Sequence, residues 1–153
     1  MAIDFGSDEY FMQQALIQAR MAAEEGEVPV GAVIVTGNKV IAKAYNQTER
    51  LTDVTAHAEI LAITSAFNAL GAKYLPDCTL YVTLEPCTMC AGALNWSQLG
   101  RIVIGAPDER RGYSRLVNKN EPVLHPKTEI VTGILAEECA ALVSDFFRQL
   151  RRK

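Results

Sequence analysis

Two pairs of residues constrain the fold of this chain more than any other feature, because they form one chemical set only if the fold brings them together. His57 and Glu59 are separated by one residue, and Cys87 and Cys90 by two. Zinc binds nitrogen and sulfur ligands tetrahedrally, and a catalytic zinc site uses three protein ligands and leaves the fourth position to water. We therefore predict a site for one zinc ion with His57, Cys87 and Cys90 as its ligands.

The spacing alone leaves the role of Glu59 open, because a carboxylate could be a fourth zinc ligand or a proton carrier beside the open position. A structural zinc site fits less well, since such sites close with four ligands and Cys78, Cys139 and His125 stand in no paired spacing. A thioredoxin-like redox site leaves the histidine and the glutamate unexplained. We predict that Cys78 and Cys139 are core residues and that His125 lies on the surface.

The size and composition of the chain indicate one soluble unit. With 153 residues, of which 49% are hydrophobic, we expect a single domain over residues 1–153. No signal peptide is visible, no apolar run approaches the roughly 20 residues that span a bilayer, and four cysteines are few for a disulfide scaffold. We expect a cytoplasmic protein with no membrane segment. The net charge is −3, but residues 101–153 carry 10 Lys and Arg against 7 Asp and Glu, which indicates either a polyanionic partner or an ordinary solvated surface.

Apolar periodicity and turn residues predict alternating helices and strands. The first strand has almost no polar alternation, so we expect it to be central and covered on both faces. The order of the elements favours an α/β fold, a three-layer α/β/α sandwich with a mostly parallel or mixed sheet. We expect the last helix to bury Leu142, Phe146 and Phe147, and Trp96 to lie in the core or at an interface. The predicted helices cover residues 7–26, 57–70, 87–97 and 136–151, and the predicted strands cover residues 28–35, 39–45, 79–84, 101–105 and 129–131.

The two motifs suit hydrolytic deamination of an aromatic ring. Both stand at the start of a predicted helix, where the helix dipole and a metal cation favour thiolates over thiols. Zinc lowers the pKa of a bound water from about 16 to about 7, so hydroxide is available at neutral pH. Its attack on a ring carbon requires protonation of a ring nitrogen and of the leaving amino group. We predict that Glu59 carries these protons and stays off the metal, a role that a non-catalytic zinc-binding scaffold does not need.

The pattern His57-Ala58-Glu59 with Pro86-Cys87-x-x-Cys90 is the signature of zinc nucleobase deaminases. Longer stretches resemble the bacterial tRNA-specific adenosine deaminases of the cytidine deaminase superfamily, which convert the wobble adenosine of a tRNA anticodon to inosine. The resemblance covers nearly the whole chain, and its most specific stretches are residues 27–33, 55–60, 80–93 and 133–139.

This resemblance implies a cytidine deaminase-like, five-stranded mixed sheet and a homodimer with one zinc ion per subunit. It also implies a tRNA anticodon loop whose target base is flipped into the zinc pocket. By position, Asn46 matches the asparagine that holds the base, and Val30, Leu84 and the backbone of Ala58 match its pocket. Asp108 matches an aspartate near the flanking nucleotide. The C-terminal segment that approaches the RNA corresponds to Phe146, Phe147 and Arg148.

Residues 109–117 depart from the family pattern, which has a Lys-Thr-Gly type turn at this place. Because this segment borders the substrate entrance, a free nucleobase or nucleoside such as guanine or cytosine is the alternative substrate, with the same zinc mechanism. The segment is nevertheless basic, so we predict that it contacts tRNA phosphates and that Tyr113 stacks on a base. Its predicted phosphate-binding residues are Arg110, Arg111, Arg115 and Lys119.

Overall fold

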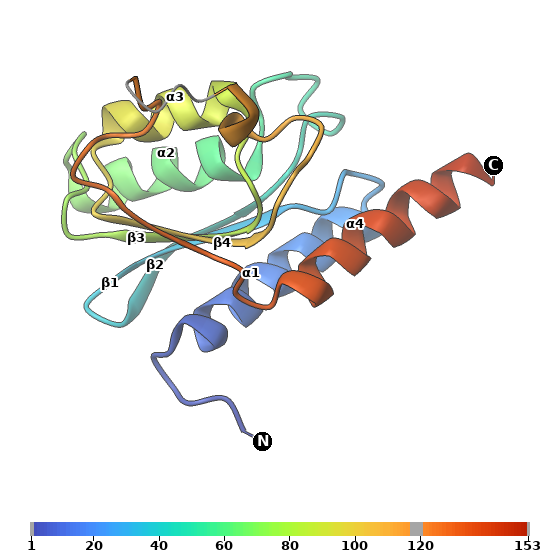
Figure 1. Cartoon of the computed structure of the whole chain (residues 1–153), viewed down its shortest axis with the longest axis horizontal. Coiled ribbons are helices and arrows are strands. Elements are labelled where there is room, and N and C mark those ends of the chain that lie inside the picture. Colours follow the sequence, from blue (N-terminus) through green and yellow to red (C-terminus); the bar gives the residue numbers. More distant parts are fainter. Residues whose placement is uncertain (1, 117–120, 153) are drawn as a thin grey trace.

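The computed structural model describes residues 2–116 and 121–152, which form helices on both faces of one five-stranded sheet (Figure 1). The predicted elements are confirmed, with small shifts at their ends. The strand expected from Val28 begins at Gly31, because the N–H of Val30 donates to the carbonyl of Val28 at 2.8 Å in a tight turn. The helices are α1 (Asp8–Glu24), α2 (Ala58–Leu70), α3 (Thr88–Ser97) and α4 (Ala136–Arg151), with a 3₁₀-helix η1 (Tyr113–Leu116), and the strands are β1 (Gly31–Thr36), β2 (Lys39–Tyr45), β3 (Thr79–Leu84), β4 (Arg101–Ala106) and β5 (Glu129–Thr132).

The sheet is mixed, and its strand order is β2-β1-β3-β4-β5. β1 pairs antiparallel with both β2 and β3, whereas β3, β4 and β5 are parallel to one another. Gly37 and Asn38, both with positive φ, form the turn that closes the β1–β2 hairpin. β1 is buried from Gly31 to Val35, which confirms that this apolar strand is central and covered on both faces.

Helices α2 and α3 cover one face of the sheet and helices α1 and α4 the other, which confirms the three-layer α/β/α sandwich (Figure 1). On one face, α2 and α3 pack on a core that includes Ile34 and Leu80. On the other face, α1 and the start of α4 pack on a core that includes Val33 and Val103. Neighbouring residues of a strand point to opposite faces, so Val33 and Ile34 of β1 belong to different cores.

The C-terminal helix α4 buries less of its apolar side than predicted. Near its start it approaches β4 so closely that a Cβ on Gly105 would lie 2.5 Å from the sulfur of Cys139. Beyond these turns the helix runs past the sheet (Figure 1). Leu142 and Phe146 are half-buried and Phe147 is 38% exposed, so the prediction that Phe147 is buried is wrong.

Three predictions about single residues have clear outcomes. Cys78 and Cys139 are buried core residues, as predicted. Trp96 is 77% exposed, so it is not a core residue.

Among the described residues, no helix combines the length and the apolar character needed to cross a membrane.

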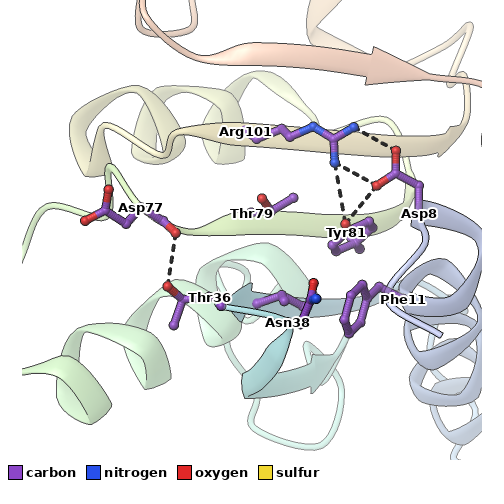
Figure 2. Close-up of a pocket in the computed structure, with 11 residues that line it drawn as sticks. Asp8, Phe11, Thr36, Asn38, Asp77, Thr79, Tyr81 and Arg101 are labelled. Atoms are coloured by element: carbon purple, nitrogen blue, oxygen red, sulfur yellow. Dashed lines mark hydrogen bonds and ion pairs between the residues drawn. The ribbon is translucent and has the colours of Figure 1, made fainter.

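A polar network ties the start of α1 to the sheet (Figure 2). Arg101 donates from Nη1 and Nη2 to the two carboxylate oxygens of Asp8, each at 2.7 Å, and the Tyr81 hydroxyl donates to Asp8 at 2.8 Å. The hydrogen bond from Arg101 lowers the pKa of Asp8, and burial raises the pKa of Tyr81. The three residues line a pocket of about 540 Å³ where β3 and β4 begin. The metal motif follows the other end of β3, so this network anchors α1 at a distance from that motif.

Candidate zinc and active site

The N-termini of two helices on the same face of the sheet position the predicted zinc ligands (Figure 1). His57 is the N-cap residue of α2, and Cys87 is the N-cap residue of α3. Cys90 follows in the first turn of α3 and is fully buried. The backbone of Cys87 is extended, so α3 begins at Thr88, one residue after the predicted start of this helix.

The three side chains have the geometry of a tetrahedral zinc site. The Nδ1 atom of His57 lies 3.7 Å from Sγ of Cys87 and 3.5 Å from Sγ of Cys90, and all three possible ligand atoms lie within 4.8 Å of one another. Zinc bonds of about 2.3 Å to sulfur and about 2.1 Å to nitrogen, at tetrahedral angles, require a nitrogen–sulfur separation of about 3.6 Å. One imidazole and two thiols therefore fit zinc and leave one coordination position for water or substrate.

The three groups also perturb one another's protonation. The hydrogen bond with Cys90 lowers the pKa of Cys87 to about 4, and this hydrogen bond together with burial raises the pKa of Cys90. The pKa of His57 is raised, chiefly by its hydrogen bond with Cys87. A zinc ion requires deprotonated thiols and a neutral imidazole. Zinc binding to this cluster therefore releases protons and weakens as the pH falls.

Glu59 lies in the first turn of α2, two residues after His57, and is 3% exposed. The close group of possible metal ligands in the described part of the chain contains His57, Cys87 and Cys90 but not Glu59. Burial raises the pKa of Glu59 to about 7. The site can therefore combine a bound metal ion with a separate, buried carboxyl group, that of Glu59, which can accept and donate a proton.

The antiparallel pairing of β1 with β3 brings two predicted pocket residues to the end of the sheet that carries the ligands. Ala32 is opposite Val82 in this pairing. Val30 directly precedes β1, and Leu84 is the last residue of β3. Val30 belongs to the core under α2 and α3, and Leu84 packs against that core. Val30 is buried and Leu84 is partly buried, so both can form an apolar wall next to the cysteine motif.

Asn46 connects this end of the sheet to α2. Its N–H donates to the carbonyl of Val30 at 3.1 Å, and its side-chain oxygen accepts the N–H of Ala58 at 2.8 Å. Asn46 is 8% exposed, so both bonds are largely sheltered from solvent. The structure thus brings together the predicted base-binding residues Asn46, Val30 and Ala58.

Residues 108–114, which we call the basic turn, contain Asp108 and two of the predicted phosphate-binding arginines. The Oδ1 atom of Asp108 accepts the N–H groups of Arg110 and Arg111, each at 3.0 Å. Both arginines are exposed. The guanidinium group of Arg115, which follows the basic turn, contacts the carbonyl of Arg110. Arg110, Arg111 and Arg115 therefore lie together.

The basic turn lies directly against the cysteine motif. Gly112 forms a β-bridge with Cys87, and the N–H of Tyr113 donates to the carbonyl of Pro86 at 2.9 Å. This contact places Tyr113 in the core, where it is 9% exposed. The prediction that Tyr113 stacks on a base is therefore wrong, because its ring packs inside the protein.

Two other predicted RNA contacts are not beside the ligands. Phe147 and Arg148 lie on α4, on the face of the sheet opposite α2 and α3 (Figure 1). Arg148 pairs with Asp145 on the same helix at 3.2 Å. Lys119 lies outside the described residues.

Two buried glutamates for which the sequence pattern predicts no role hold the loops around the site. Glu27 is 1% exposed, and its carboxylate accepts the N–H groups of Glu49 at 3.1 Å and Arg50 at 2.8 Å. The loop that it holds lines a pocket of about 470 Å³ beside His57. Glu85 is 8% exposed and holds the basic turn in a similar way. An acidic residue next to a buried strand is the signal that could have found both, since buried carboxylates require partners.

Known proteins are similar to this chain over most of its length. A family model for the cytidine and deoxycytidylate deaminase zinc-binding region matches residues 6–106. The chain is 47% identical over 148 residues to the tRNA-specific adenosine deaminase of Bacillus subtilis strain 168, which covers 95% of this chain and 92% of that protein.

Two solved structures are also similar. One comes from biochemical and structural studies of A-to-I editing by tRNA:A34 deaminases at the wobble position of transfer RNA. Its TM-score to this chain is 0.82 and the sequence identity is 44%. The aligned region covers 87% of this chain and 98% of the chain in that structure. The other is the X-ray structure of guanine deaminase from Bacillus subtilis, with a TM-score of 0.63 and 39% identity over 66% of this chain and 65% of that chain.

Proposed function

Because the chain belongs to the tRNA-specific adenosine deaminases, within the cytidine and deoxycytidylate deaminase family, we propose that it converts adenosine to inosine at the wobble position of a tRNA anticodon. The reaction is a zinc-dependent hydrolytic deamination. The observation that carries the proposal is the cluster of His57, Cys87 and Cys90 with the buried Glu59 nearby, in a chain 47% identical to a tRNA-specific adenosine deaminase.

Glu59 moves the protons in the proposed reaction. Zinc held by His57, Cys87 and Cys90 would lower the pKa of a bound water to about 7. Glu59 accepts a proton from the attacking water and donates it to the ring nitrogen N1, next to the attacked carbon C6. A second proton, which comes from the hydroxyl group now on C6 and is also passed by Glu59, converts the amino group into ammonia, which leaves as the C6–N bond breaks. The water oxygen remains on C6, so adenosine and water give inosine and ammonia.

The pocket that holds the flipped base is formed in this proposal by Asn46, Val30, Ala58 and Leu84. The side-chain oxygen of Asn46 already accepts the N–H of Ala58, so its amide nitrogen is the atom that can donate to the base. Val30 and Leu84 supply apolar surface for the base face. Asp108 orders the turn that borders this pocket.

The basic turn contacts the phosphates of the anticodon loop in this proposal. We expect Arg110→Ala combined with Arg111→Ala to weaken tRNA binding roughly tenfold and to reduce the slope of log Kd against log salt by about 1.4, since each phosphate contact on a single strand contributes about 0.7. Binding is measured by filter retention over a range of salt concentrations. The matched control is Lys39→Ala combined with Lys43→Ala, which removes the same charge from exposed positions of β2. An unchanged slope in the arginine variant contradicts the assignment.

We propose further that the protein acts as a cytoplasmic homodimer. Large apolar side chains are exposed on the layer formed by α2 and α3, which a second copy of the chain would cover. They include Leu70 at 45%, Met89 at 39% and Trp96 at 77% exposure. The four cysteines are all free, which is consistent with a reducing compartment.

A comparison of substrates tests the proposed function. We expect zinc-loaded protein to form inosine in a tRNA transcript with adenosine at the wobble position, and to release no ammonia from free adenine, adenosine, cytosine or guanine. Inosine is measured by nuclease digestion and chromatography, and ammonia by a coupled assay. Turnover of guanine without turnover of the tRNA would replace this proposal by a guanine deaminase function.

A further inference from the structure

Glu85 is a buried carboxylate that takes part in no ion pair of the described residues. It stands between Leu84, which ends β3, and Pro86, which precedes the zinc ligand Cys87. Only 8% of Glu85 is exposed. A buried carboxylate is strongly destabilising unless it accepts hydrogen bonds. The groups that donate to Glu85 therefore indicate its structural role.

Both carboxylate oxygens accept backbone N–H groups of the basic turn. Oε1 accepts the N–H of Asp108 at 3.1 Å, and Oε2 accepts the N–H of Ser114 at 2.9 Å. Each oxygen thus holds one end of the turn. A glutamine has only one acceptor oxygen, and its amide nitrogen would face one of these N–H groups. The position therefore requires a carboxylate.

The basic turn is wrapped around this carboxylate at contact distance. A Cβ on Gly112 would lie 2.4 Å from Oε2 of Glu85, so a side chain at position 112 is excluded. The N–H of Glu85 donates to the carbonyl of Ala106 at 2.8 Å, which fixes the chain just before the turn. The Glu85 side chain is therefore the centre around which the turn is built.

We propose that Glu85 is a positioning residue that fixes Arg110 and Arg111 relative to the zinc ligands, and so adapts the site to a polynucleotide. Glu85 holds Asp108, and Asp108 holds the N–H groups of both arginines. Cys87 lies two residues after Glu85 in the same chain. Phosphates bound by the turn are thereby kept at a constant distance from the zinc pocket, and tRNA binding does not have to order the turn. The inference rests on the proposed function, because it requires the arginines to contact tRNA.

The substitution Glu85→Gln tests this role. We expect the KM for tRNA to rise about tenfold, because one N–H of the turn loses its acceptor, while kcat changes less than about threefold and the zinc content remains one ion per chain. Hydrogen–deuterium exchange of residues 107–116 should become faster while exchange in α2 and α3 does not change. The control Glu109→Gln makes the same charge change at an exposed position of the same turn and should leave the exchange rates unchanged.

A double-mutant cycle separates positioning from general stability. In the Glu85→Gln background, adding Arg110→Ala and Arg111→Ala should raise the KM by much less than it does in the unmodified protein, because the arginines are already displaced. Fully additive losses, or an unchanged KM and unchanged exchange in Glu85→Gln, would overturn the proposal. Should Glu85→Gln not fold, Ser114→Pro removes the N–H that Oε2 accepts, and an unchanged KM in that variant overturns it equally.

The two levels of the proposal fail in different ways. If the unmodified protein forms no inosine in tRNA, the proposed function is wrong and the role of Glu85 in substrate selection is wrong with it. If the unmodified protein deaminates tRNA and the Glu85→Gln cycle is additive, only the positioning role is wrong.

Discussion

Replacing Glu59 by glutamine should lower kcat for wobble deamination by about 10²- to 10⁴-fold, the range for loss of a general acid–base group. Glutamine has nearly the same shape as glutamate but cannot accept and return a proton. Glu59 is 3% exposed in the first turn of α2, so bulk water has little access to replace it. Single-turnover formation of inosine with saturating enzyme measures the chemical step directly.

Two controls accompany the Glu59→Gln variant. Its zinc content should remain one ion per chain, because Glu59 does not belong to the close ligand group. The variant Glu24→Gln makes the same change at an exposed position of α1 and should keep full activity. Full activity in the Glu59→Gln variant would rule out Glu59 as the proton carrier. Loss of zinc from this variant would indicate that Glu59 is a zinc ligand instead.

The second large effect is expected when a zinc ligand is removed. Cys87→Ala leaves only His57 and Cys90 in the cluster, so zinc affinity should fall by more than the roughly 10- to 100-fold that loss of an outer partner costs. Deamination should be undetectable in protein dialysed against zinc-free buffer. Metal content by mass spectrometry and activity after addition of zinc are the two measurements.

The matched control for Cys87→Ala is Cys139→Ala. Cys139 is also buried, but it packs against β4 on the opposite face of the sheet. This control should retain one zinc ion and full activity, with a free energy of unfolding lowered by about 1 kcal/mol, as for small changes in a core. A chelator should inactivate the unmodified protein reversibly. Zinc retained at full stoichiometry by Cys87→Ala would refute the ligand assignment.

The zinc site could be predicted because each of its halves is a local pattern. Cys87 and Cys90 share one helix start whatever the rest of the fold, and His57 and Glu59 share another. Helix starts, apolar strands and the turn at residues 37–38 also depend on neighbouring residues, so the elements and the α/β class followed from the chain itself.

Side-chain burial was predicted less well, because it depends on partners far away in the chain. Tyr113 stands in a polar, arginine-rich segment and was expected on the surface, but the wrapping of this segment around Glu85 turns its ring into the core. Phe147 stands on an apolar stripe and was expected inside, but the residues of α4 that belong to or pack against the core are Cys139 and Leu142, near the start of the helix.

By itself, the sequence determined which residues can bind zinc and move protons, since these properties belong to the side chains and to their spacing in short helical turns. Only the tertiary structure decided how the surroundings of the site are assembled. The antiparallel pairing of β1 with β3 brings the start of β1, which Val30 precedes, to the end of β3, where Leu84 lies. Glu85 holds the basic turn against the cysteine motif. Both are contacts between distant segments, and their geometry depends on strand register and packing that no local pattern specifies.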